Sequence, residues 1–261
     1  MASLPATFDL APSAALAAVL LGTFGAVFGS FIAALVIRWP QDRSVMSGRS
    51  ACDACGRVLV ARDLVPLVSA AVARGKCRYC GAPIDPLHWR IEALGVVMGV
   101  SAGALAPLPA AAAIAVFGWL LLALAALDIA EFWLPDELTA TLALAGLATG
   151  ALGLAPPLVD RLIGGAGGFV ALWLVGATYK RVRGRDGLGG GDPKLLGAIG
   201  LWLGWQALPV TLLLACLIGF GVVLFWMLTG RGAKMDDRLP FGALLAAAAY
   251  ASALAMLGTW T

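Results

Sequence analysis

The sequence predicts an all-α polytopic membrane protein with about eight transmembrane helices and one small soluble insertion. Hydrophobic residues make up 61% of the 261-residue chain and charged residues only 13%, and the mean hydropathy is +0.92. Soluble domains carry roughly 25% charged residues. Eight apolar stretches approach the roughly 17 to 25 residues that cross a bilayer. We therefore expect the lipid bilayer, and no nucleic acid, as a partner.

The eight apolar stretches divide the chain. They run from about Ala14 to Ile37, Ile91 to Ala106, Ala110 to Leu127, Leu138 to Leu154, Val159 to Ala177, Leu195 to Leu208, Val210 to Leu228 and Leu239 to Leu257. The second and the sixth are short, so seven helices with a re-entrant segment is the alternative. The expected units are a first helix at 1–38, a soluble domain at 39–90 and a membrane core of about seven helices at 91–261.

The basic residues indicate the orientation of these helices. Of the 18 Lys and Arg, nine lie between Arg38 and Arg90, five between Lys180 and Lys194, and three between Arg231 and Arg238. Eight helices and an external N-terminus place all three segments on one face, which the positive-inside rule makes cytoplasmic. Seven helices would break this agreement, so we favour eight.

The first helix is expected to be retained, because no Lys or Arg precedes it and a cleavable signal needs a basic start. Gly25, Gly29 and Ser30 have the small-residue spacing that lets helices approach closely in lipid. The helix should end at Arg38-Trp39-Pro40, where a cation and an aromatic ring mark the membrane interface and proline stops the helix.

The soluble insertion contains two Cys-x2-Cys pairs, Cys52 with Cys55 and Cys77 with Cys80, and a glycine follows each pair. Four thiolates at this spacing form a tetrahedral Zn²⁺ site, which a segment with so small a core needs for folding. Disulfides are the alternative, but thiols stay reduced in the cytoplasm. Four ligands leave no open position, so the predicted zinc is structural.

Two polar residues stand at the start of the second apolar stretch. His88, the only histidine, lies beside Trp89 and Arg90 and is interpreted as an interfacial residue. Glu92 falls near a helix N-terminus, where a carboxylate is electrostatically favoured. It is also a candidate contact for a cationic group of a substrate.

Two acids stand at membrane edges. Asp128 ends the apolar run FGWLLLALAALD, where the helix dipole disfavours a negative charge, and an acid at membrane depth indicates function. Asp136 follows Pro135 and precedes an apolar run, so an N-cap explains it. Asp192 follows four glycines in Gly187-Leu188-Gly189-Gly190-Gly191, which allow positive φ or close packing.

Asp192 has a structural alternative, because Asp-Pro at a helix start is typical of an N-cap. Capping alone does not require the preceding glycines, however. Two carboxylates that meet, one protonated and one ionised, can activate water and protonate a leaving amide nitrogen. From their helix ends we expect Asp192 to be the resting base and Asp128 the acid, although a coupled pair titrates jointly.

These motifs resemble a known family. Gly189-Gly190-Gly191-Asp192 resembles the GxGD motif of intramembrane aspartyl proteases. The run from Gly191 to Leu196, together with the four-cysteine segment, resembles the type IV prepilin peptidases (prepilin leader peptidase/N-methyltransferases). The likeness includes Gly29-Ser30-Phe31, Cys77 to Ile84, Leu134-Pro135-Asp136 and Leu239-Pro240-Phe241-Gly242. Ala34 departs from the asparagine common in that family, and Pro193 from the bulky apolar residues frequent after the catalytic aspartate.

The resemblance implies a bifunctional enzyme of the bacterial inner membrane. It would cleave the basic leader of type IV prepilins or pseudopilins after a glycine at the cytoplasmic face, and N-methylate the new N-terminus with S-adenosylmethionine. Asp128 and Asp192 would be catalytic. Gly189, Gly191, Lys194, Asp136 and Glu92 would bind the substrate or support the site. No local motif specifies the S-adenosylmethionine pocket.

Two other functions fit parts of the sequence. An ion-coupled transporter would also use membrane acids, but transporter sites lie near the midplane between repeats, and we find no internal repeat. A leader peptidase without methylation would not need the cysteine domain. The sequence does not specify the particular pilin, the choice between pilus and secretion system, or the oligomeric state.

Overall fold

The computed structural model describes residues 12–46, 48–230 and 239–257, and in this part of the chain every regular element is a helix. The α-helices are α1 (Pro12–Arg38), α2 (Val68–Val72), α3 (Pro86–Leu105), α4 (Ala110–Glu131), α5 (Asp136–Ala151), α6 (Leu158–Arg183), α7 (Asp192–Leu203), α8 (Leu208–Leu228) and α9 (Phe241–Ala255). Short 3-10 helices cover Trp39–Gln41, Ala61–Asp63 and Trp205–Ala207. The basic segment from Arg231 to Arg238 lies outside the described residues.

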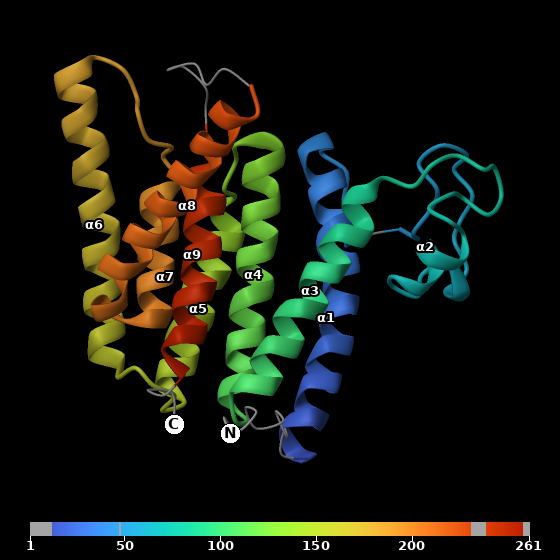
Figure 1. Ribbon diagram of the computed structural model, residues 1–261, viewed down its shortest axis with the longest axis horizontal. Coiled ribbons are helices and arrows are strands. Elements are labelled where there is room, and N and C mark those ends of the chain that lie inside the picture. The colour runs from blue at the N-terminus through green and yellow to red at the C-terminus, as the bar shows by residue number, and fades with distance from the viewer. Residues whose placement is uncertain (1–11, 47, 231–238, 258–261) are drawn as a thin grey trace, which may run out of the picture.

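Each apolar stretch forms a helix, but the helices differ in length (Figure 1). Four segments are long and apolar enough to span a membrane: Ser13–Gln41, Ala110–Glu131, Leu158–Arg183 and Trp205–Leu228. The chain is therefore a multi-pass membrane protein. Helix α7 has 12 residues, which rise about 18 Å against a hydrocarbon core of about 30 Å. The count of about eight spans thus stays a prediction.

Helix α4 forms the centre of the bundle, and most of its side chains are buried. Its Phe117 stacks on Trp202 of α7 with ring centroids 4.8 Å apart. The indole N–H of Trp202 donates to the carbonyl of Leu142 in α5 at 2.7 Å. These contacts fix α5 and α7 against α4, and all three helices carry a predicted site acid.

Helices α1 and α3 pack antiparallel at backbone distance. A Cβ added at Gly29 would lie 2.7 Å from the Cα of Glu92. Along the same interface Gly25 meets Gly95, Leu21 meets Gly99 and Ala18 meets Gly103. The expectation that small residues of the first helix allow close approach is confirmed, and α3 is the partner.

Arg161 of α6 is fully buried and connects three segments at one end of the bundle. Its guanidinium donates to the carbonyls of Gly146 in α5 and Leu201 in α7 at 2.9 and 3.0 Å. Further bonds reach the carbonyls of Leu154, Ala155 and Pro156 and the hydroxyl of Thr149. Carbonyls near helix C-termini lack helical partners, so Arg161 stabilises this end.

The chain between α1 and α3 forms a separate lobe, which Figure 1 shows on the far side of α1 and α3 from α6. Two isolated antiparallel bridges, Ala51 with Val58 and Lys76 with Pro83, each close a cysteine turn. Gly56 and Gly81 follow the pairs with φ of 68° and 74°, a conformation that favours glycine. The lobe is held by turns rather than by an apolar core.

Candidate functional site

Asp128 lies in the last turn of α4 and is 5% exposed. Its Oδ2 accepts a hydrogen bond of 2.8 Å from the backbone N–H of Ala243, in the first turn of α9. The residues before Ala243 belong to the Leu-Pro-Phe-Gly motif, whose role the sequence did not reveal. Proline and glycine start the helix there, so its first N–H groups are free to point at a carboxylate.

Asp192 is the first residue of α7 and is likewise 5% exposed. Its Oδ2 accepts a hydrogen bond of 3.0 Å from the N–H of Gly189. The N-cap position belongs to Gly191, and no side chain caps this helix. The N-cap interpretation of Asp192 is therefore wrong, because its carboxylate binds the preceding loop.

The two acids come together at one end of the bundle. Asp128 lies close enough to Asp192 for its charge to act on that carboxyl group. Leu134 packs between the loop before Asp192 and the start of α9, which binds Asp128: a Cβ at Gly191 would lie 2.8 Å from the Cβ of Leu134, and one at Gly242 would lie 2.9 Å from its Cδ1. In the sequence, Leu134 stands out only as part of the Leu134-Pro135-Asp136 motif.

The glycine run serves close packing rather than unusual backbone angles. Each of Gly187, Gly189, Gly190 and Gly191 has negative φ, so the positive φ that the sequence allowed is not used there. A Cβ at Gly189 would lie 3.0 Å from Oδ2 of Asp192, and one at Gly191 would overlap Leu134, whereas one at Gly190 would meet nothing within 4 Å. Steric crowding thus explains why positions 189 and 191 are glycine, but it does not explain Gly190.

Asp136 and Lys194 form an ion pair, with the Lys194 Nζ 2.7 Å from Oδ1 and 2.9 Å from Oδ2 of Asp136. Asp136 is the first residue of α5, and Pro135 holds the N-cap position without a side-chain cap. The expectation that Asp136 is an N-cap is wrong. Its carboxylate instead reaches α7, a contact that no local pattern reveals.

The helix ends do not distinguish the two buried acids as the sequence suggested. Asp128 ends α4, but its carboxylate accepts a bond from the N-terminal turn of α9, while Asp192 lies at the N-terminus of α7. A helix N-terminus favours the charged form in both cases. The asymmetry behind the base and acid assignment is therefore absent.

The four cysteines of the lobe come together. The Sγ atoms of Cys52, Cys55, Cys77 and Cys80 all lie within 4.8 Å of one another, and those of Cys52 and Cys80 are 3.9 Å apart. All four thiols are free. A tetrahedral zinc with bonds of about 2.3 Å has sulfur–sulfur edges of about 3.8 Å. The cluster fits a closed four-sulfur metal site.

The protonation of these thiols also suits a metal. Backbone N–H groups of Tyr79 and Cys80 stabilise the thiolate of Cys77 and lower its pKa to about 7. The N–H of Ala82 acts the same way on Cys80, but the neighbouring thiols, led by Cys77, raise its pKa to about 11. A divalent cation would release the remaining protons, because only thiolates bind it.

Glu92 contacts the lobe. It is 6% exposed, and its Oε2 accepts a hydrogen bond of 2.8 Å from the N–H of Leu67. Leu67 has φ of 61°, which is unfavourable for a branched side chain. Glu92 therefore holds the turn before α2 against α3.

Comparison with known proteins gives two family models that divide the chain. The type IV leader peptidase family matches residues 115–224, and the bacterial peptidase A24 N-terminal domain matches residues 23–106. Asp128 and Asp192 fall in the first match and all four clustered cysteines in the second. No solved structure matches.

Several curated proteins named prepilin leader peptidase/N-methyltransferase are similar to this chain. That of Burkholderia pseudomallei strain 1026b is 40% identical over 82% of the chain and 69% of its own length. That of Aeromonas hydrophila is 38% identical over 81% and 73%. That of Dickeya chrysanthemi is 34% identical and covers 96% of both chains.

Proposed function

This chain belongs to the prepilin leader peptidase/N-methyltransferase family, and on that premise we propose that it cleaves the leader peptide of type IV prepilins or pseudopilins and methylates the new N-terminus. The observation that carries the cleavage step is the convergence of Asp128 and Asp192, two buried acids from different helices that interact electrostatically. Each carboxylate is oriented by one backbone N–H.

The pair performs hydrolysis as aspartic dyads do, with one carboxylate ionised and the other protonated. The ionised carboxylate takes a proton from a water molecule, whose oxygen bonds to the scissile carbonyl carbon. The protonated one gives its proton to the amide nitrogen as the carbon–nitrogen bond breaks. We treat the two acids as a coupled pair, because the helix ends favour neither as base.

The remaining predicted residues support this dyad in different ways. Gly189 donates its N–H to Asp192, and Gly191 gives Leu134 room to pack. Lys194 and Asp136 fix the start of α7. Glu92 acts on the lobe rather than on the dyad.

The proposed setting is the bacterial inner membrane, with eight spans and with the dyad and the lobe at the cytoplasmic face. The basic residues between Arg38 and Arg90 and between Lys180 and Lys194 support this orientation. The four lobe cysteines hold a structural Zn²⁺, since their spacing fits the ion and leaves no fifth ligand. S-adenosylmethionine supplies the methyl group.

Co-expression with a prepilin, followed by mass spectrometry of the pilin, tests the function. The wild type should yield a cleaved product with one added methyl group. Asp128→Asn and Asp192→Asn should each lower cleavage by about 100-fold or more, whereas Glu131→Gln, an exposed acid in the same turn as Asp128, should not. Cleavage at the wild-type rate by either Asp variant refutes the dyad, and cleavage without methylation refutes the second activity.

A further inference from the structure

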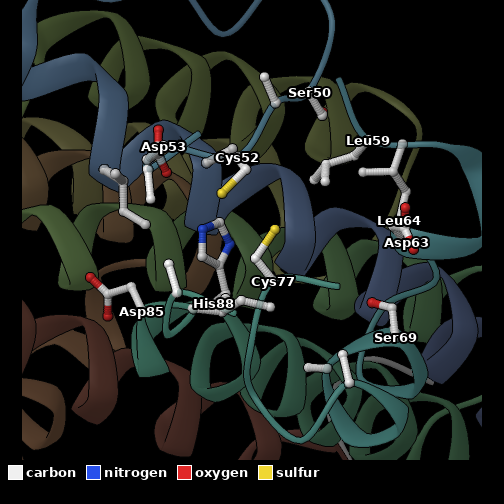
Figure 2. A pocket seen from close by; sticks show the side chains of 18 of the residues that line it. Ser50, Cys52, Asp53, Leu59, Asp63, Leu64, Ser69, Cys77, Asp85 and His88 are labelled. Carbon is white, nitrogen blue, oxygen red and sulfur yellow. The ribbon is translucent and has the colours of Figure 1, made fainter. Parts of the chain in front are cut away.

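A cavity of about 480 Å³ lies between the end of α1, the start of α3 and the lobe. Pockets for small molecules typically measure about 300 to 1,000 Å³. Figure 2 shows Cys52, Cys77 and His88 turned toward it from the cysteine turns and the start of α3. The dyad contributes no residue to its lining, whereas Cys52 and Cys77 of the metal cluster do, so the cavity is separate from the dyad and adjoins the cluster.

The acids around the cavity already have protein partners. Asp53 pairs with Arg43, Asp63 with Arg78 and the Tyr79 hydroxyl, Asp85 accepts from the N–H of Leu87, and Glu92 from that of Leu67. A carboxylate has about four acceptor positions. These acids are therefore fixed in place and still able to accept hydrogen bonds from a ligand.

Arg38 is different. Its side chain lines the cavity and is half-buried, and among the described residues it has no hydrogen-bond or ion-pair partner. The side chain of Lys76 also lines the cavity without such a partner in the described part of the chain, but it is exposed. The hydroxyls of Ser30, Ser50 and Ser69 line the same cavity, also without a described protein partner. A partly desolvated guanidinium is best satisfied by a carboxylate, which it binds through two parallel N–H bonds.

The lining thus suits a ligand with one carboxylate, several hydroxyl groups and a positive charge. The free guanidinium of Arg38 matches the first feature, and the fixed carboxylates match the other two. S-adenosylmethionine has all three, in its amino-acid carboxylate, its ribose and its sulfonium. We propose that this cavity binds S-adenosylmethionine and that Arg38 holds its carboxylate, an inference that rests on the proposed methyl transfer.

The two family matches also separate the cavity from the dyad. All residues lining the cavity, from Ser30 to Glu92, fall within the N-terminal match at 23–106, whereas both acids fall within the peptidase match at 115–224. The relatives' names combine two activities. With the peptidase acids in one part, the methyl donor belongs in the other.

The cavity and the dyad are connected through one aromatic contact. Trp39, directly after Arg38, meets Trp133 edge to face with ring centroids 5.6 Å apart. Trp133 precedes Leu134, which packs against Gly191, next to Asp192, and against Gly242 at the start of α9. The end of α1, which lines the cavity, and the loop between the two acids are therefore in contact.

The transfer step balances with these components. The lone pair of the neutral amine forms a bond to the methyl carbon, and the methyl–sulfur bond breaks with its electron pair going to sulfur. The positive charge passes from sulfur to nitrogen, and water takes the extra proton of the amine.

The proposal is tested by measuring ligand binding to the purified full chain in lipid nanodiscs by calorimetry. The probes are S-adenosylhomocysteine, which keeps the carboxylate, and 5′-methylthioadenosine, which lacks it. Arg38→Gln should weaken S-adenosylhomocysteine binding by about tenfold or more, as expected for a lost charge-assisted pair, and change methylthioadenosine binding by less than about twofold. Arg38→Lys should retain part of the affinity. Arg62→Gln removes an exposed arginine of the same lobe outside the cavity and should bind both probes like the wild type.

Ala34→Phe is the second variant, because Ala34 lines the cavity from α1. It should weaken binding of both probes by about tenfold or more by filling the space. Wild-type affinity in this variant refutes the cavity as the site. Wild-type affinity in Arg38→Gln, or an equal loss of both probes, refutes the role of Arg38. If Arg38→Gln fails to fold, as judged by zinc content and melting temperature, Ala34→Phe decides.

The outcome also separates this inference from the proposed function. A wild-type chain that cleaves and methylates a prepilin, while both cavity variants bind the probes normally, refutes the cavity alone. A wild-type chain that cleaves but neither methylates nor binds S-adenosylhomocysteine refutes the methyl-transfer activity and the cavity assignment together.

Discussion

Lys194 binds both carboxylate oxygens of Asp136, so the first turn of α7 is joined to the first turn of α5. Asp192 stands two residues before Lys194 in the same turn. The ion pair therefore fixes the position of a catalytic candidate without touching it. At the other end of the bundle, Arg161 joins the same two helices through their carbonyls.

Lys194→Met should destabilise the protein by about 1 kcal/mol or less, because the pair is largely exposed and surface pairs contribute little. Cleavage should fall several-fold through misplacement of Asp192. The exchange variant Asp136→Lys/Lys194→Asp should recover part of this loss. Lys180→Met breaks another exposed Lys–Asp pair, with Asp186, and serves as the control for denaturation and cleavage assays. Equal cleavage by Lys194→Met and Lys180→Met would contradict the positioning role.

Alanine substitutions at the glycines around the two acids should differ by position. Gly191→Ala brings a Cβ to 2.8 Å from Leu134, and Gly242→Ala brings one to 3.0 Å from Asp128. Displacement of a reacting group by about 1 Å can cost up to about 100-fold in rate, so both should cleave prepilin at least about tenfold more slowly. Gly190→Ala meets nothing within 4 Å and should cleave at the wild-type rate. Steady-state cleavage of a synthetic prepilin compares the three, and equal rates would refute the steric explanation.

The lobe should depend on its metal. Cys77→Ser removes the buried ligand of the cluster, so bound zinc should fall from about one per chain to nearly zero and the lobe should lose hydrogen-exchange protection. Cys216→Ser changes an exposed thiol of α8 outside the cluster and should leave both unchanged. Elemental analysis and exchange mass spectrometry measure the two effects. A Cys77→Ser protein with full zinc content would show that the four sulfurs are not the ligands.

Arg161→Met should be strongly destabilising, because at least five carbonyls lose a donor inside the bundle. Each buried unsatisfied acceptor costs roughly 1 to 3 kcal/mol, so we expect a loss of about 3 kcal/mol or more. Arg161→Lys should recover little of it, since an ammonium carries only three donors. Arg181→Met, at an exposed position of the same helix, is the control in denaturant titrations. A loss below about 1 kcal/mol for Arg161→Met would contradict this account.

The helices and the cysteine cluster could be predicted because their signals are local. Apolar stretch length marked α1 and α3 to α9, and Cys-x2-Cys spacing marked the cluster. The sequence marked the stretch that forms α7 as short, but it did not predict where the helix ends. The apolar stretch runs on to Leu208 with Gln206 as its one polar residue, yet Gly204 takes φ of 75° and ends the helix after Leu203.

The partners of the site residues were not predictable, since they depend on contacts between distant segments. Asp136 was assigned to its own helix and instead binds Lys194, and the bond from Leu67 to Glu92 joins residues 25 positions apart. Arg161 stood out as the one basic residue away from the three basic segments. Its acceptors are carbonyl groups, which leave no pattern in a sequence.

The close antiparallel packing of α1 against α3 has a consequence for the history of the chain. With Gly29 against Glu92 and Gly25 against Gly95, the end of α1 and the start of α3 lie side by side. The lobe therefore leaves and re-enters the bundle at nearly one point. Such a hairpin can gain, lose or exchange an inserted module during evolution while every interhelical contact of the membrane scaffold is retained.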